Sequence, residues 1–248
     1  MTERTHILIL AGTFEARLLA KAACAAFPDV TVVLSFAGVV SDLPDTGVPT
    51  RIGGFGGADG LARYLKNHET RILIDATHPF ASQMSWNAYH AAKQADVALM
   101  RLDRPPWAPG PEDNWTFVPD MASAAAGLDT GSRVFLAVGR KEISTFLDRI
   151  DLFALTRMIE PPADPLPDHW RLELARPAQS MEAERALLTT HRIERIVCKN
   201  SGGTRSFAKL AAARALGVPV TMIERPALPR VLAAETPEHI LRQLAHYL

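Results

Sequence analysis

Short apolar runs that break into small or polar residues recur along the chain, and each leads into a segment with helical periodicity. The runs are HILILAGTFEA (6–16), RILIDATHPFA (71–81), RVFLAVGRKEI (133–143) and RIVCKNSGGTR (195–205). Near-continuous apolar runs of this length are typical of buried parallel strands. Parallel α/β sheets bind ligands outside the carboxyl ends of their strands, where helix N-termini attract anions. The pattern therefore predicts anion-binding loops in both halves of the chain.

Predicted strands alternate with predicted helices throughout. We expect strands at 6–12, 30–38, 48–54, 71–75, 96–102, 115–118, 133–138, 151–158, 171–175, 194–199 and 218–223. We expect helices at 14–27, 58–68, 79–95, 120–127, 140–149, 179–190, 204–216 and 236–248. Such alternation is typical of βαβ units. The predicted fold class is α/β, with two Rossmann-like three-layer domains, mainly parallel sheets and a ligand cleft between the domains.

A proline-rich segment near residue 109 divides the chain, because proline fixes φ and removes an N–H donor. We expect an N-terminal domain at 1–103, a linker at 104–114 and a C-terminal domain at 115–235. The helix at 236–248 is expected to pack back on the N-terminal domain. A second proline-rich stretch, 159–170, is long for a connection and reads as a binding loop or as a structural tether.

Charge and composition exclude several classes of protein. Lys and Arg number 27, as do Asp and Glu, so a general attraction to nucleic acid or to a membrane surface is not indicated. No apolar run approaches the ~20 residues of a membrane span, and the N-terminus lacks the pattern of a signal peptide. Cys24 and Cys198 have no metal-ligand spacing. These features predict a cytoplasmic protein without a metal site.

The first two strand ends favour a phosphate-bearing ligand. Gly12 permits close backbone approach, and Thr13 can cap the following helix and donate to a phosphate. Ser35 stands where NAD-binding domains carry an acid for the ribose 2′-hydroxyl, and Arg51 on the next strand could pair with a 2′-phosphate. A nicotinamide cofactor would then be NADPH rather than NADH. The alternative is that Arg51 merely occupies the sheet edge.

Two more loops of the first half carry candidate chemistry. Residues 51–57 include four glycines, with Gly53 and Gly54 among them, and this density exposes backbone N–H groups. His78 follows Thr77 where a helix is expected to begin, which disfavours the protonated ring and suits a neutral N–H donor or proton relay. A flexible loop and a structural histidine are the alternatives.

Cations follow two strands of the second half. Arg140 and Lys141 come directly after one strand, and Lys199 opens the sequence 199–203 at the end of another, with Arg205 just beyond. Partial burial of Lys199 disfavours its charged form and suits it to proton donation or carboxylate binding. The second half is therefore expected to bind an acidic ligand.

Together, these motifs resemble the precorrin-6A reductase family of cobalamin biosynthesis. The resemblance rests on Gly12-Thr13 with Glu15-Ala16, and on 51–57, 75–81 and 199–203, in the order of the family over nearly the whole chain. It implies NADPH-dependent reduction of one double bond of the precorrin-6A macrocycle, which gives precorrin-6B. It also implies a tetrapyrrole substrate whose carboxylates meet the second-half cations, and it allows transient contacts with neighbouring pathway enzymes.

The resemblance and the loop chemistry together assign roles to residues. Lys199 and His78 are the candidate catalytic proton donors, with water as the alternative acid. The residues expected to bind NADPH are Gly12, Thr13, Glu15, Ser35, Arg51, Gly53, Gly54 and Thr77. The residues expected to bind the macrocycle are Arg140, Lys141, Asn200, Ser201, Gly202 and Arg205.

Two other classes of function stay open. Tyr89 and Lys93 have the Tyr-x-x-x-Lys spacing of nucleotide-sugar epimerases and dehydratases, although they fall inside a predicted helix with no catalytic serine upstream. A non-enzymatic two-lobed small-molecule sensor would also suit two α/β domains, although no helix-turn-helix segment precedes the first strand. Titration with NADPH and NADH separates these classes from the reductase.

Overall fold

The computed structural model describes residues 5–38, 46–178 and 180–248, which form two compact units. Unit 1 takes in the chain up to Pro105 and again from Ala227, and unit 2 runs from Pro106 to Pro226. Each unit contains a six-stranded sheet, and every recorded strand pair in both sheets is parallel. The predicted α/β class with two Rossmann-like domains is confirmed.

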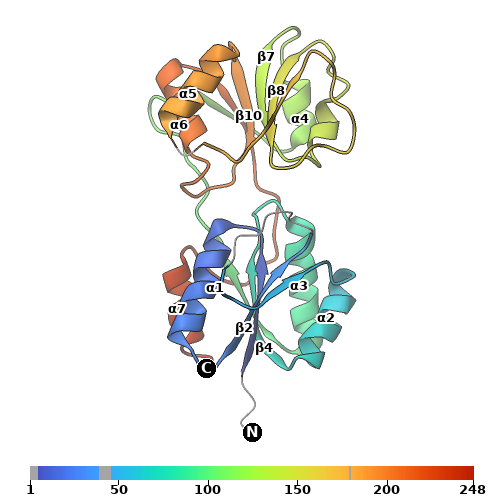
Figure 1. The fold of residues 1–248 in the computed structure, drawn as a ribbon, viewed down its shortest axis with the longest axis vertical. Helices are drawn as coiled ribbons and strands as arrows, with labels where there is room; N and C mark the ends of the chain where they lie inside the picture. The colour runs from blue at the N-terminus through green and yellow to red at the C-terminus, as the bar shows by residue number, and fades with distance from the viewer. Residues whose placement is uncertain (1–4, 39–45, 179) are drawn as a thin grey trace. The chain divides into compact units, whose positions relative to one another are not determined.

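Unit 1 is a three-layer sandwich. Its sheet has the order β12-β5-β4-β1-β2-β3. In Figure 1, α1 and α7 cover one face of this sheet and α2 and α3 cover the other. The elements are β1 (His6–Ala11), α1 (Phe14–Ala26), β2 (Thr31–Phe36), β3 (Thr50–Ile52), α2 (Gly57–Asn67), β4 (Thr70–Ala76), α3 (Ser82–Ala95), β5 (Ala98–Leu102), β12 (Leu232–Ala234) and α7 (Pro237–Leu244).

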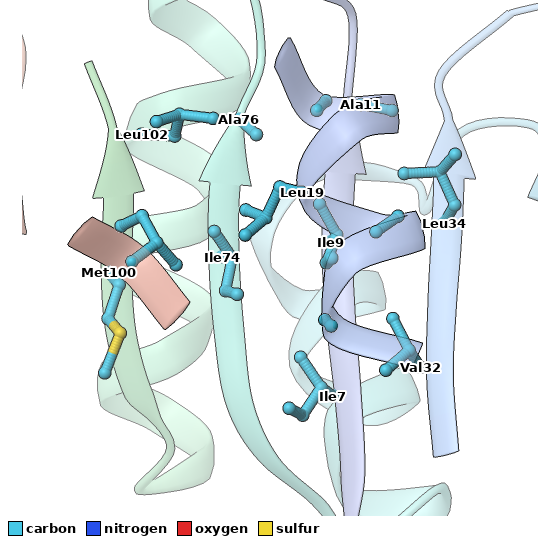
Figure 2. Close-up of a cluster of buried hydrophobic side chains, with 14 of the residues drawn as sticks. Ile7, Ile9, Ala11, Leu19, Val32, Leu34, Ile74, Ala76, Met100 and Leu102 are labelled. Atoms are coloured by element: carbon cyan, nitrogen blue, oxygen red, sulfur yellow. The ribbon is translucent and has the colours of Figure 1, made fainter. Parts of the chain in front are cut away.

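The core of unit 1 follows from strands that are apolar on both faces. Ile7 and Ile9 of β1 point to the α1 side of the sheet, in one buried cluster with Leu19 of α1 (Figure 2). Leu8 and Leu10 point the other way, into the layer formed by α2 and α3. Because successive side chains of a strand alternate between faces, one continuous apolar run supplies both layers.

Unit 2 repeats the architecture with the sheet order β6-β11-β10-β7-β8-β9. Helices α5 and α6 lie on one face and α4 lies on the other (Figure 1). The elements are β6 (Trp115–Val118), α4 (Met121–Ala126), β7 (Arg133–Ala137), the 3₁₀ helix η1 (Ile143–Phe146), β8 (Phe153–Met158), β9 (Arg171–Leu174), α5 (Met181–Thr190), β10 (Arg195–Lys199), α6 (Ala208–Leu216) and β11 (Val220–Ile223).

Both sheets have a switch point, where successive connections leave in opposite directions. In unit 1 it lies between β1 and β4, and in unit 2 it lies between β7 and β10. Open α/β sheets bind ligands outside the carboxyl ends of the strands at this point. The four loops singled out in the sequence follow these four strands.

Several expectations about elements differ from the structure, and one of them is the helix expected at 204–216, which begins at Ala208. The helix expected at 140–149 is the single 3₁₀ turn η1, because only Ile143 and Phe146 are buried there and their i, i+3 spacing suits one turn. The expected helix 79–95 begins at Ser82. The expected helix 179–190 begins at Met181, and its expected first residue, Gln179, lies outside the described residues.

The segment expected to end the C-terminal domain belongs in part to unit 1. Residues 227–235 include β12, which pairs with β5 of unit 1, and Asp103 N donates to Ala234 O at 2.9 Å. A three-residue strand shows no period of its own, so only its distant partner defines it. The following helix α7 packs on α1 through Ile240 and Leu244. None of the described helices is long and apolar enough to span a membrane.

Candidate functional site

The turn after β1 is closed by Thr13. The Thr13 hydroxyl accepts from Ala16 N at 3.1 Å and donates its single proton to Ala76 O at 3.0 Å. The predicted helix cap is confirmed. The proposed donation from Thr13 to a phosphate is not available in this arrangement, because the hydroxyl proton already bonds the end of β4.

Gly12 lets the β1 and β4 loops approach closely. A Cβ atom at Gly12 would lie 3.2 Å from the backbone N of His78, tighter than ordinary packing. Gly12 itself is exposed, so the backbone of the turn faces solvent. The close packing explains a glycine at this position without a positive φ.

An ion pair between Asp75 and Arg101 fixes the loop after β4. Thr77 Oγ1 and Thr77 N both donate to Asp75 Oδ1, at 2.6 and 3.2 Å. Arg101 Nε donates to the other oxygen of this buried carboxylate at 3.1 Å, and Arg101 Nη1 donates to Pro229 O at 2.9 Å. Thr77 is thus fixed by an ion pair that also ties the returning chain to the sheet. Sequence reasoning missed Arg101, which lies 26 residues from Asp75.

His78 precedes its helix instead of beginning it. A turn closed by Ala81 N donating to His78 O at 2.7 Å separates the residue from α3, whose N-cap is Ala81. The expectation of a histidine at the helix N-terminus is therefore wrong. Phe80 N donates to His78 Nδ1 at 3.2 Å. A neutral His78 ring with this partner carries its proton on Nε2.

Arg51 and Ser35 meet at the ends of β3 and β2, where they are register partners. Arg51 Nη1 lies 3.4 Å from Ser35 Oγ and donates to Gly53 O, while Arg51 Nη2 donates to Gly54 O at 2.8 Å. The guanidinium also stacks on the Phe55 ring at 3.8 Å from its centroid. Residues 31–38 contain no acid. A cation, rather than a carboxylate, occupies this corner of the sheet.

A small crevice opens beside the first turn of α1. Its lining residues come from the ends of β1, β4 and β5 and are Thr13, Glu15, Thr77, Pro79, Leu102 and Arg104. Glu15 Oε2 accepts from Arg104 Nη1 at 2.6 Å. Sequence reasoning placed Arg104 in the linker, because nothing local to it indicates a partner 89 residues away.

Lys199 is paired at the corresponding point of unit 2. Its Nζ donates to Glu142 Oε1 at 2.8 Å, and both side chains are largely shielded from solvent. A Cβ atom at Gly139 would collide with the Glu142 carboxylate. The missing side chain at Gly139 therefore makes room for the ion pair, in which Glu142 was not foreseen.

The other predicted cations of unit 2 are not drawn into this pair. Arg140 Nη1 bonds Glu160 Oε2 at 2.7 Å on the surface, and Lys141 and Arg205 are exposed. They lie on the loops that follow β7 and β10, at the same edge of the sheet as Lys199. These two loops therefore place three exposed cations at this edge, and Arg140 and Lys199 are each bonded to a carboxylate.

Asn200 holds protein backbone rather than presenting its amide to solvent. The buried side chain accepts from Trp107 N at 2.8 Å and donates to Trp107 O at 3.0 Å, and the Trp107 indole donates to Gly203 O at 2.8 Å. Arg225 donates to the backbone oxygens of Asn200 and Ser201 at 2.9 and 3.3 Å. The 199–203 loop is thus bonded to the first and the last chain segment of unit 2, through Trp107 and Arg225.

The Tyr89–Lys93 pair and a metal site find no support in the part of the chain that the structure describes. Tyr89 and Lys93 lie within α3, where the Tyr89 ring packs against Trp86 and His90 and Lys93 is exposed. Among the described residues no group of His, Cys, Asp and Glu is placed to hold a metal ion.

Comparisons with known proteins cover nearly the whole chain. The family model "Precorrin-6x reductase CbiJ/CobK" matches residues 6–245. The chain is 48% identical to a precorrin-6A reductase of Rhodococcus erythropolis, over 97% of this chain and 96% of that one. It is 42% identical to the precorrin-6A reductase of Rhodobacter capsulatus, over 98% and 97%. A solved structure described as CobK precorrin-6A reductase superposes with a TM-score of 0.91 at 41% identity, over 98% of this chain and 97% of that one.

Proposed function

The chain belongs to the precorrin-6x reductase CbiJ/CobK family, and we propose that it reduces precorrin-6A to precorrin-6B with NADPH as the hydride donor. As a member similar over its whole length, it is a precorrin-6A reductase of cobalamin biosynthesis. The use of NADPH, the product and the residue roles below are our proposal. The main observation in support of NADPH as the cofactor is the pairing of Ser35 and Arg51 at the ends of β2 and β3.

This corner fits a 2′-phosphate better than a 2′-hydroxyl. A carboxylate at the end of β2 would accept from a ribose 2′-hydroxyl and repel a phosphate, and residues 31–38 contain none. Arg51 can exchange its bonds to Gly53 O and Gly54 O for two bonds to phosphate oxygens, which suit the guanidinium fork. Ser35 adds a hydroxyl donor beside it. Unit 1 is thus proposed to select NADPH over NADH.

The turn between β1 and α1 fits the pyrophosphate of the same cofactor. The exposed Gly12 backbone and the capped N-terminus of α1 present N–H groups and the positive end of a helix dipole. Thr13 and Thr77 shape this edge through their bonds to Ala76 O and Asp75. Gly53 and Gly54 form the neighbouring wall by the 2′-phosphate.

The reaction adds two hydrogens across one double bond. NADPH supplies one of them as a hydride when it is bound. The chain supplies the other as a proton, from Lys199 Nζ or from His78 Nε2. Lys199 bonds the Glu142 carboxylate, which holds the ammonium group at the end of β10. For His78 to act as the acid, its ring first takes a proton from solvent on Nδ1 in place of the bond from Phe80 N, and Nε2 then donates its proton and leaves a neutral ring.

Unit 2 is proposed to bind the carboxylates of the macrocycle. Arg140, Lys141 and Arg205 are exposed cations on the loops that follow β7 and β10. Ser201 and Gly202 line the loop after Lys199, and Asn200 keeps that loop in place through Trp107. The cytoplasmic location and the transient contacts with neighbouring enzymes stay predictions from the sequence.

Titration of the purified protein with NADPH and NADH tests the choice of cofactor. Wild type is expected to bind NADPH more tightly, and Arg51→Ala is expected to weaken NADPH binding by about tenfold or more, because a charged hydrogen bond is lost. NADH binding should change little in this variant. Arg71→Ala, which removes an exposed cation at the amino end of β4, is the control. Equal affinity of wild type for both cofactors would contradict NADPH selection.

Turnover of Lys199→Ala and His78→Ala identifies the proton donor. Loss of a positioned acid lowers the rate by about a hundredfold or more, while NADPH affinity is retained. If only one variant slows, that residue is the donor. If both keep wild-type rates, the proton comes from water and neither side chain is catalytic.

A further inference from the structure

The crevice beside α1 contains an ion pair that the sequence did not reveal. Glu15 lies in the first turn of α1, and Arg104 follows β5. Their atoms Oε2 and Nη1 lie 2.6 Å apart, and the side chains are 18% and 15% exposed. The pair is therefore largely shielded from water, which strengthens its electrostatic attraction, and it still has a surface that solvent reaches.

The other polar side chains of this crevice have their protons engaged. The Thr13 hydroxyl donates to Ala76 O, and the Thr77 hydroxyl donates to Asp75. Pro79 and Leu102 contribute apolar surface. Arg104 is thus the cationic side chain among the crevice residues, and its guanidinium carries several N–H donors in a rigid fork.

Glu15 lies in the first turn of α1, where the helix dipole favours a negative charge of either a side chain or a ligand. The N-terminus of α1 attracts the pyrophosphate of a dinucleotide, and a bare carboxylate in the same turn would repel it. The bond to Arg104 neutralises this carboxylate and fixes the guanidinium at the mouth of the turn. One guanidinium can bond a carboxylate on one side and a phosphate on another.

We propose that Arg104 is a pyrophosphate-binding residue of the dinucleotide site and that Glu15 is its positioning residue. This role depends on the proposed use of NADPH. It replaces the expectation that Glu15 itself touches the cofactor, because a carboxylate does not donate to phosphate oxygens. It also moves Arg104 from the linker into the binding site of unit 1.

Equilibrium titrations with NADPH and with adenosine 2′-monophosphate, which lacks the pyrophosphate, test the role of Arg104. Arg104→Ala is expected to weaken NADPH binding by about tenfold or more and to leave the binding of adenosine 2′-monophosphate unchanged. Arg51→Ala should weaken both. Arg71→Ala removes the same charge at the opposite end of the unit 1 sheet and should change neither.

The double variant Glu15→Gln/Arg104→Ala separates direct binding from simple charge neutralisation. Removal of the unpaired carboxylate is expected to recover part of the lost affinity, so that NADPH binding falls between Arg104→Ala and wild type. Wild-type affinity in the double variant would mean that Arg104 only neutralises Glu15, and it would overturn direct phosphate binding.

Two outcomes distinguish this inference from the proposed function. An Arg104→Ala variant that is folded by circular dichroism and binds NADPH like wild type overturns the inference alone. A wild-type protein that binds neither NADPH nor NADH overturns the proposed function itself.

Discussion

Gly139 is a single residue on which the Lys199–Glu142 ion pair depends. Substitution by alanine places a Cβ atom against the Glu142 carboxylate. We expect Gly139→Ala to lower turnover by about tenfold to a hundredfold, because a small displacement of a positioned group has effects of this size. NADPH affinity should be retained. Gly110→Ala is the matched control in unit 2, where the added methyl makes an ordinary contact. Unchanged turnover in Gly139→Ala would contradict a positioning role of the Glu142 carboxylate.

His6 makes the stability of unit 1 depend on pH. Burial, and then the nearby His68, lower the pKa of His6 from its usual 6.5. The ring bonds Thr70 Oγ1 at 2.8 Å and stacks on His68. Because the unfolded chain binds this proton first, stability is lost as pH falls from about 6.5 toward the lower folded-state pKa. Above about pH 6.5 the residue contributes no such dependence.

Urea unfolding at about pH 7.5 and about pH 5.5 measures this effect. Wild type is expected to lose stability at the lower pH. His6→Asn, which keeps a polar partner for Thr70, should lose less. An identical loss in both proteins would assign the pH dependence to other groups.

Local chemistry predicted some contacts of the site and not others. The Thr13 cap and the adjacency of Ser35 and Arg51 follow from short-range rules, because one lies in a helix turn and the other in neighbouring strands. The ion pairs of Arg101 and Arg104 were not predicted from the sequence, because their carboxylate partners lie in other elements, far away in the chain. From the sequence, the Asn200 amide was expected to bind a ligand, but the fold places Trp107 beside it and the amide bonds the Trp107 backbone.

At the scale of elements, the loop after β10 is fastened by the Asn200 amide to the segment before β6. Asn200→Ala leaves the backbone N–H and C=O of the buried Trp107 without these partners. An unpaired buried polar group costs about 1–3 kcal/mol, so unit 2 should be destabilised by at least this amount. Asn200→Asp keeps the acceptor for Trp107 N and should lose less. Chemical denaturation that ranks the two variants equally would contradict a two-bond clamp.

Most elements were predictable because the central strands are apolar on both faces and helices α1, α4, α5 and α7 begin at side-chain caps. Strand β12 was not, since three residues cannot show a period and its partner lies far away in the chain: Leu232 pairs with Met100, 132 positions earlier. The helix expected at 140–149 failed for a related reason. Its polar residues reach solvent and only one turn finds apolar partners.

At the scale of the whole molecule, the chain leaves unit 1 after Pro105 and returns to it at Ala227. Helix α7 then completes the apolar layer on α1 through the fully buried Ile240 and Leu244. Each unit has its own core, so a core substitution in one should act on that unit.

Ile240→Ala tests this division. Loss of a buried isoleucine side chain costs about 2–5 kcal/mol, which unit 1 should bear. Calorimetry is expected to show a lower midpoint for the transition that NADPH stabilises and an unchanged midpoint for the other. An equal shift of both transitions would show that the two units unfold as one.

Isotope transfer in the reaction itself tests NADPH-dependent reduction. Precorrin-6A is incubated anaerobically with the protein and with NADPH that carries deuterium at the position transferred as hydride. The mass of the product is then measured by mass spectrometry. We expect a product that gains one deuterium from NADPH and one hydrogen from the medium, with NADH a much poorer donor. An unchanged macrocycle, or equal conversion with NADH, would contradict an NADPH-dependent reductase.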